Sequence, residues 1–323
     1  MGNVLSLLVQ PYFFYTILRL ATPLIFAAMA ALVSTKSGLS NIIIDGTMLM
    51  SAVVGTIASA LTNSLFWGAI AGMATGLLMS YGLAFFHLKF KAPANLTGVA
   101  INLFTSNFSV FVCYEFSGDK GSTMQLHSLS FPTVDIPIIK DIPFIGQVLS
   151  GHNVITYMAL LSIILVYILI YKTTLGLRIR TVGENPNAAS SVGIVPERMQ
   201  TIAILISGIL ASWGGMFLSM GYATNWTRNM TSARGFIGVA ANAVGGGNPV
   251  WVTLTTFIFA VSSAMNVILQ ALMIPTEFTS MIPFVFSLSL VVLTAFVKRL
   301  RKEKLRKDHI AVVEKQLAQK APL

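Results

Sequence analysis

Long apolar runs separated by short polar gaps dominate the chain. Eight of these runs are long enough for the roughly 20 helical residues that cross a hydrocarbon core of about 30 Å. They begin near Tyr12, Leu39, Leu65, Pro93, Val154, Thr201 and Trp251, and the last extends from Phe278 to Val297. A shorter, glycine-rich run from Ser232 to Gly247 predicts a broken or tilted span. The pattern predicts an all-α integral membrane protein with about nine transmembrane helices, in a range of eight to ten, some of them short or broken.

The longest polar gap in the second half extends from Tyr171 to Met199. Asn185 followed by Pro186 is typical of a helix N-cap with proline at the first helical position, and Gly193 can close that helix in the left-handed conformation. Pro196 marks the start of the next apolar run. We expect a short amphipathic helix at the membrane surface, between two spanning helices.

Composition supports a membrane protein, because 55% of the residues are hydrophobic and only 10% are charged, whereas a soluble domain carries about 25% charged residues. The mean hydropathy is +0.77. The single cysteine, Cys113, excludes an internal disulfide. The four histidines have no ligand-like spacing, so the sequence predicts no metal site.

The basic residues predict the orientation. If nine segments span, 16 of the 21 Lys and Arg residues fall on one side. These are Lys36, Lys89, Lys91, Lys172, Arg178, Arg180, Arg198 and the nine basic residues from Lys298 to Lys320. The positive-inside rule therefore places segment 172–198 and the tail in the cytoplasm, and the N-terminus and loop 117–152 outside. We predict a transmembrane domain over residues 1–297 and a basic cytoplasmic tail over residues 298–323. No aromatic residues are interleaved in the basic run after residue 297, so it favours anionic lipid over nucleic acid.

Asp45 interrupts an apolar run, where an ionised carboxylate costs at least about 2.5 to 3.5 kcal/mol. Asn41, four residues earlier, would lie on the same helical face. The pair either lines a hydrophilic path or makes a structural hydrogen bond between helices, and the sequence leaves both open. Arg19 is a possible partner of Asp45.

Amide side chains interrupt two further apolar stretches. Asn95 and Asn102 follow a proline in the first half, and Asn242 precedes the glycines at positions 245–247 in the second. Amides in lipid must find partners, so these side chains favour protein or water over lipid. The candidates for the substrate path are Asn41, Asp45, Asn95, Asn102 and Asn242.

Several classes of protein are excluded or disfavoured by missing patterns. The chain has no G-x-x-x-x-G-K-[ST] sequence, so it has no P-loop of its own for hydrolysing ATP. No Ser/His/Asp set and no pair of carboxylates falls in one predicted cavity, which argues against an enzyme and leaves no catalytic candidate. No span carries several Arg or Lys residues, so a voltage sensor is unsupported.

Three stretches together resemble the permease subunits of bacterial ABC importers of the branched-chain amino acid and simple-sugar group. They are ATPLIFAAMAALVSTKSGLSNIIIDGTMLM from Ala21, TLGLRIRTVGENPNAASSVGI from Thr174 and ARGFIGVAANAVGGGNP from Ala233. The likeness extends from about Thr16 to Phe296, and within the group the chain looks most like nucleoside permeases that work with lipoprotein receptors. Asp45 stands where those relatives usually carry Glu, Ile43 and Ala233 replace usual small residues or Gly, and Gly247 stands where larger residues are common. These departures bear on the substrate more than on the mechanism.

The resemblance implies a type II-like importer permease in the bacterial inner membrane. Two permease chains, identical or homologous, would enclose the path, with two ATPase subunits below and a receptor lipoprotein outside. ATP and Mg²⁺ would be used by the partner ATPase, and this chain would need no cofactor. The segment that would contact the ATPase comprises Gly176, Arg178, Arg180, Gly183, Glu184, Asn185, Pro186, Ala188, Ala189 and Gly193.

The resemblance implies import of nucleosides or a related ribose-containing solute. A simple-sugar permease of the same family is the alternative within that class. From another class, an ion-coupled secondary transporter would use Asp45 as its coupling carboxylate.

Overall fold

The structure is a computed structural model that describes residues 10–137, 144–271 and most of 281–299. Within this part of the chain, seven helices are long and apolar enough to cross a membrane. They are α2 (Pro11–Lys36), α3 (Ile44–Thr62), α4 (Leu65–Ala84) with the π-helical η1 (Phe85–Lys89), α5 (Ala94–Ser117), α8 (Val154–Lys172), α11 (Pro196–Met216) with the π-helical η2 (Phe217–Tyr222), and α13 (Pro249–Ala271). Their positions confirm the predicted multi-pass all-α architecture.

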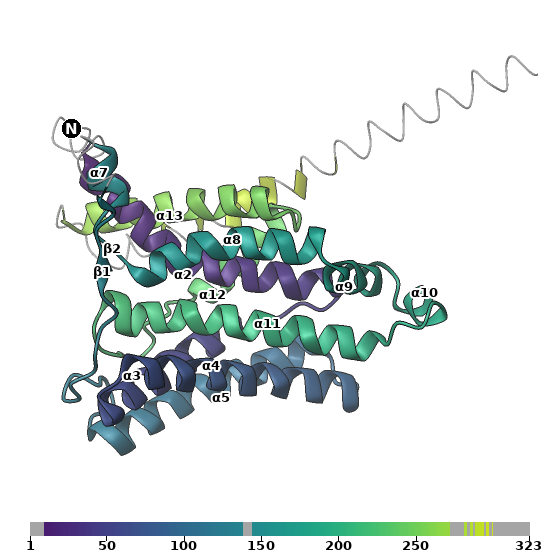
Figure 1. The fold of residues 1–323 in the computed structure, drawn as a ribbon, viewed down its shortest axis with the longest axis horizontal. Coiled ribbons are helices and arrows are strands. Elements are labelled where there is room, and N and C mark those ends of the chain that lie inside the picture. Colours follow the sequence, from purple (N-terminus) through teal and green to yellow (C-terminus); the bar gives the residue numbers. More distant parts are fainter. Residues whose placement is uncertain are drawn as a thin grey trace, which may run out of the picture.

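Helix α2 is the centre of the bundle, with 89% of its span buried. It packs against α8, α11, α13 and the short helix α12 (Arg234–Val244), while α3, α4 and α11 pack against one another (Figure 1). Small residues permit close contacts between these helices. For example, a Cβ atom on Gly238 of α12 would lie only 2.5 Å from the Cβ of Ala27. Only 22% of the α5 span is buried, so most of its apolar surface faces outward, as expected of a helix that contacts lipid.

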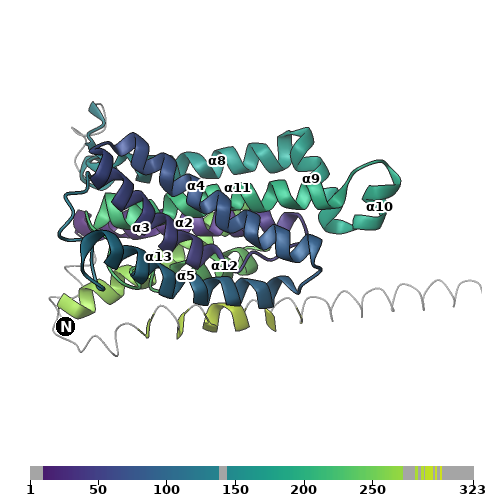
Figure 2. The same cartoon turned by 90° about the horizontal axis from the view of Figure 1, so that it is seen from below.

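The two ends of the bundle differ in structure. At one end lie the antiparallel pair β1 (Thr133–Val134) and β2 (His152–Asn153) and the short helix α7 (Ile145–Leu149). At the other end lie α9 (Thr174–Glu184) and α10 (Pro186–Ser191), and α10 extends beyond the ends of the long helices in both views (Figures 1 and 2). The predicted external loop 117–152 and cytoplasmic segment 172–198 therefore lie at opposite ends.

Helix α12 does not span the bundle by itself, because its 11 residues extend only about 16 Å at about 1.5 Å per residue. The segment before it begins at the β1–β2 end, where the Trp226 amide donates to Thr123 Oγ1 at 2.8 Å. The helix finishes at the α9 end, where the Asn242 amide donates to Thr35 at 3.0 Å. The chain thus passes from one end to the other between Trp226 and Gly247, as the prediction of a broken span requires.

The predicted count of nine spans stays a prediction. The structure confirms seven of the predicted runs, and much of the run from Phe278 to Val297 lies outside the described residues. The basic tail 298–323 also lies outside them, except for Arg299.

Candidate functional site

The N-terminus of α12 meets the first turn of α3, and Asp45 joins them. Its Oδ1 accepts a hydrogen bond from the Gly235 amide at 2.9 Å, and its Oδ2 accepts one from Thr231 Oγ1 at 3.2 Å. A Cβ atom on Gly235 would lie 2.5 Å from the Asp45 Cα, so only glycine allows this approach. The first amides of a helix lack intrahelical acceptors, and a carboxylate there also complements the helix dipole. Asp45 therefore serves as the acceptor for the start of α12.

Asn102 on α5 closes the other side of this junction. Its Nδ2 donates to the carbonyl oxygen of Ile42 at 2.8 Å, and its Oδ1 accepts from the Gly46 amide at 2.9 Å. The amide thus holds both the residues before α3 and the first turn of α3. We call the set Asp45, Asn102, Thr231 and Gly235 the α3–α12 junction.

The prediction that Asn41 shares a helical face with Asp45 is wrong, because α3 begins only at Ile44. Asn41 lies in a segment without regular secondary structure, where its Oδ1 accepts from the Ile43 amide at 3.1 Å and its Nδ2 donates to Ser207 on α11 at 2.9 Å. These side-chain bonds replace the helical ones, which the apolar pattern alone does not reveal. Asn41 therefore fastens the start of α3 to α11.

The suggested pairing of Arg19 with Asp45 is also not observed. The Arg19 guanidinium lies over the ring of Tyr222, 4.3 Å from the ring centroid. The two carboxylate oxygens of Asp45 are engaged by Thr231 and Gly235 instead.

The five predicted path residues do not form one site. Asn41, Asp45 and Asn102 gather around the start of α3. Asn95 is exposed at the start of α5, and Asn242 lies at the far end of α12 from Asp45.

Helix α10 has the predicted capping. The Asn185 side chain accepts from the backbone amides of Asn187 and Ala188 at 3.0 and 3.1 Å, and Gly193 has a φ of 82°. The buried Ala189 packs with Val182 and Met199, which attaches α10 to α9 and α11.

Helix α9 was not expected, because the sequence predicted only one short helix in this segment. Its apolar residues Leu175, Ile179 and Val182 recur at helical spacing and face the bundle, a pattern that could have revealed it. A Cβ atom on Gly183 would overlap the carbonyl oxygen of Lys36, so α9 lies directly against the end of α2.

The ten predicted coupling residues divide into two sets. Gly176 and Ala189 are buried, and Gly183 and Arg180 are partly buried, so these positions serve packing within the chain. The exposed positions are Arg178, Glu184, Asn185, Pro186, Ala188 and Gly193. Sequence reasoning missed the apolar members of this surface, which are Leu177, Val192 and Val195, with exposed fractions of 56%, 71% and 56%. Apolar residues within a polar segment were the available signal.

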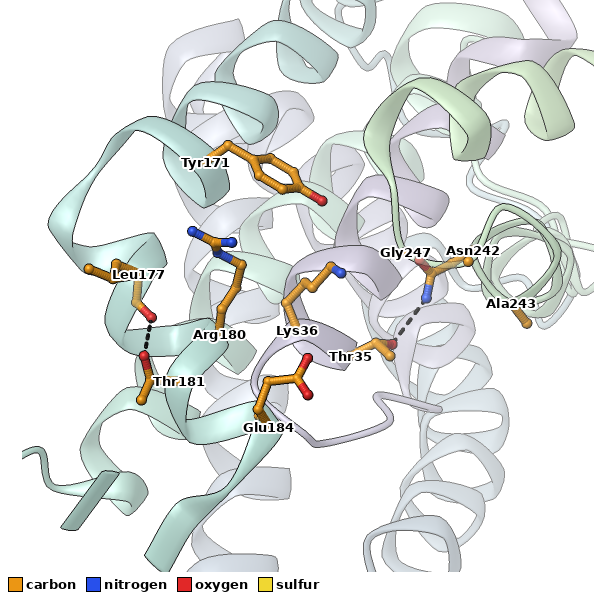
Figure 3. A pocket seen from close by; sticks show the side chains of 12 residues that line it. Thr35, Lys36, Tyr171, Leu177, Arg180, Thr181, Glu184, Asn242, Ala243 and Gly247 are labelled. Carbon is orange, nitrogen blue, oxygen red and sulfur yellow. Dashed lines mark hydrogen bonds between the residues drawn. The ribbon is translucent and has the colours of Figure 1, made fainter. Parts of the chain in front are cut away.

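A cavity of about 620 Å³ opens at the same end of the bundle (Figure 3). Its walls come from the ends of α2, α8, α9 and α12, and we call it the α9–α12 cavity. It is lined by Thr35, Lys36, Tyr171, Leu177, Arg180, Thr181, Gly183, Glu184, Asn242, Ala243, Gly246 and Gly247. Of the predicted residues, it combines one path candidate, Asn242, with part of the coupling segment. Among the described residues, no three His, Cys, Asp or Glu side chains gather in a way that could hold a metal.

Comparison with known proteins places this architecture in a family. The model of the family described as the branched-chain amino acid transport system permease component matches residues 13–293. The guanosine ABC transporter permease protein NupQ of Bacillus subtilis is 31% identical over 315 residues, covering 92% of this chain and 94% of the relative. The nucleoside ABC transporter permease protein NupC of Lactococcus lactis is 27% identical, covering 91% and 93%.

A putative glucose ABC transporter permease protein, TsgC13 of Haloferax volcanii, is 28% identical, covering 78% of this chain and 76% of the relative. No solved structure matches the chain. The family match includes the seven described spans apart from Pro11 and Tyr12, the α3–α12 junction and α9–α10. The chain therefore belongs to the permease component family of branched-chain amino acid transport systems.

Proposed function

We propose that this chain is the transmembrane subunit of an ABC importer that moves nucleosides, or a related ribose-containing solute, into the cell. The support is its similarity to NupQ and NupC, which extends over more than nine-tenths of each chain. A simple sugar is the second candidate, and the similarity to TsgC13 favours it.

The proposal of a separate ATPase rests on the exposed surface of α9–α10. Leu177 is exposed on α9, and Val192 and Val195 are exposed in the connection between α10 and α11, at the end of the bundle beyond which α10 extends (Figure 1). Exposed apolar side chains clustered in such a place mark a protein interface. The positive-inside rule puts this end in the cytoplasm, where an ATPase works.

The contacts that α9 and α10 make with the other helices would transmit a movement of the ATPase to the bundle. Ala189 attaches α10 to α9 and α11, and Gly183 places α9 against the end of α2. Helix α2 in turn touches α12 through Ala27 and Gly238, and α12 meets α3 at Asp45. Physical contact thus continues from the proposed ATPase surface to the α3–α12 junction.

The remaining parts of the assembly follow from the proposal. A second permease chain, identical or homologous, completes the path, and a substrate-binding lipoprotein docks at the end that carries loop 117–152. The assembly resides in a bacterial inner membrane with the C-terminus in the cytoplasm. The chain itself uses no cofactor, since the partner ATPase consumes ATP with Mg²⁺.

Uptake measurements test the substrate. Cells that lack the gene should lose uptake of a radiolabelled nucleoside, and the gene on a plasmid should restore it. Excess unlabelled nucleosides should compete and simple sugars should not. Competition by sugars alone would replace the first candidate with the second.

The energy source is a separate test. In the proposed importer, an uncoupler that removes the ion gradients while cellular ATP stays constant leaves uptake unchanged. Collapse of uptake under that condition would favour an ion-coupled transporter, in which Asp45 would be the coupling group.

A further inference from the structure

The α9–α12 cavity contains a buried hydrogen-bond acceptor without a partner. Asn242 is only 4% exposed, and its Oδ1 has no hydrogen bond, whereas its Nδ2 donates to Thr35 Oγ1 at 3.0 Å. Buried polar atoms are nearly always satisfied, so an orphaned amide oxygen in a cavity wall points to a ligand or water.

The orientation of this amide is determined by its neighbour. The Thr35 hydroxyl donates its one proton to the carbonyl oxygen of Ala31 at 2.7 Å. Thr35 Oγ1 can therefore only accept from Asn242, which requires Nδ2 on that side. The Oδ1 atom is thus the free one, and a ligand must offer it an O–H or N–H donor.

Two cations share the cavity with this acceptor. A Cβ atom on Gly247 would lie 3.2 Å from Lys36 Nζ, so the ammonium rests against the turn after α12. The Arg180 guanidinium lies 5.1 Å from the centroid of the Tyr171 ring, and its buried Nε has no hydrogen-bond partner. Glu184 is the one acidic residue in the lining, so the cavity remains net positive.

We propose that the α9–α12 cavity binds the phosphate ester of a polyol. The phosphate interacts with Lys36 and Arg180, which suit an anion, and a neighbouring hydroxyl of the ligand donates to Asn242 Oδ1. The source of this group is either a phosphatidylglycerol headgroup or a soluble polyol phosphate. Because α9 and α12 form opposite walls, the bound ligand ties the proposed ATPase-contacting segment to the half-helix.

The test uses the complete transporter, purified with its partner subunits and placed in phosphatidylcholine nanodiscs with or without phosphatidylglycerol. Native mass spectrometry counts the retained phosphatidylglycerol, and titration with glycerol 3-phosphate or inorganic phosphate probes the soluble source. Arg180→Gln and Asn242→Asp should each weaken binding roughly tenfold. Arg180→Gln removes a charge-assisted contact with the phosphate, and Asn242→Asp places a negative charge that opposes it. Lys172→Gln is the matched control, since it removes a neighbouring charge outside the cavity.

Retention of phosphatidylglycerol without competition by glycerol 3-phosphate identifies the lipid source, and competition identifies the soluble one. Thermal unfolding shows whether each variant is folded, and Lys36→Gln replaces any variant that is not. Binding that is unchanged in the folded variants, or equally weakened by Lys172→Gln, would overturn the proposal. Failure of every probe to bind the wild-type complex would overturn it as well. Neither result bears on nucleoside uptake, which is measured separately.

Discussion

The α3–α12 junction and the α9–α10 end of the bundle differ in whether their side chains find partners within this chain. At the junction, both carboxylate oxygens of Asp45 and both ends of the Asn102 amide find partners in the same chain. At the other end, Asn242 Oδ1 and Arg180 Nε are buried without partners, and apolar side chains such as Val192 are exposed. The named side chains of the first region have their partners within this chain, whereas the second region leaves polar and apolar groups without partners in this chain.

The largest effect should come from a change on the exposed surface of α10, which we propose contacts the ATPase. Ala188 is exposed on α10, so Ala188→Arg adds a bulky charge there without entering the packing of this chain. We expect uptake to fall to background while the amount of protein in the membrane stays normal. Uptake assays combined with immunoblots of membranes measure both quantities.

The adjacent residue provides the control for this prediction. Ala189 is fully buried, so Ala189→Arg should lower the amount of folded protein as well as uptake. Normal uptake in Ala188→Arg would contradict the assignment of α10 to the ATPase interface.

The next largest effect is expected at the α3–α12 junction. Asp45→Ala leaves the Gly235 amide and the Thr231 hydroxyl without their acceptor, and should lower the free energy of unfolding by about 1–3 kcal/mol. Asp45→Asn keeps one acceptor oxygen and should cost less. Thermal unfolding in detergent compares the three proteins.

Uptake by the same variants tests the role of the carboxylate. If Asp45 is structural, uptake should follow the amount of folded protein in both variants. Abolished uptake in a normally stable Asp45→Asn variant would instead show that the charge itself is needed.

The sequence predicted those features that depend on neighbouring residues. Seven spans follow from continuous apolar runs, and the capping of α10 follows from Asn185, Pro186 and Gly193, because span length and capping are local properties. The start of α3 was misplaced, because the irregular segment before it is held by Asn102 and Ser207, which are distant in sequence.

The α9–α12 cavity could not be predicted for a similar reason. Its walls come from four helices whose lining residues extend from Thr35 to Gly247, and no single stretch carries its pattern. Asn242 was identified as a polar residue in an apolar stretch, but only the bond between Thr35 and Ala31 shows which of its atoms is free.

At the β1–β2 end, His152 has its partners within the chain, as Asp45 has at the α3–α12 junction, and a titration can test this. His152 is 1% exposed, its Nε2 donates to the Val148 carbonyl oxygen at 2.8 Å, and its ring stacks on Tyr15 with centroids 4.0 Å apart. Burial lowers the pKa of His152 below its ordinary value of 6.5, and the charge of Arg19 lowers that pKa further, although the Val148 carbonyl opposes the shift. The unfolded chain therefore binds this proton more readily than the folded chain.

Acid should accordingly destabilise the fold as the pH falls below the ordinary value of 6.5. The contribution of one such group has a slope of at most about 1.4 kcal/mol per pH unit. His152→Phe keeps a ring against Tyr15 but removes the titration, so its unfolding temperature should change less between about pH 7.5 and about pH 5.5. An identical pH dependence in the two proteins would show that the end contains no such buried, self-satisfied histidine.

The smallest effect is expected at Ala233, which precedes α12 beside the α3–α12 junction. Its φ of 58° lies in the left-handed region, and the family resemblance places glycine at this position. Relief of the left-handed conformation should gain about 1–2 kcal/mol, and the greater freedom of glycine in the unfolded chain should cost about 0.4–1 kcal/mol. Ala233→Gly should therefore raise the free energy of unfolding by about 0.5–1 kcal/mol, measured by thermal unfolding in detergent. Ala240→Gly, in the interior of the same helix, should instead lower it, because glycine weakens a helix. A loss of stability in Ala233→Gly would mean that the Ala233 methyl group contributes packing that outweighs its backbone strain, and that this edge of the junction depends on side-chain contact.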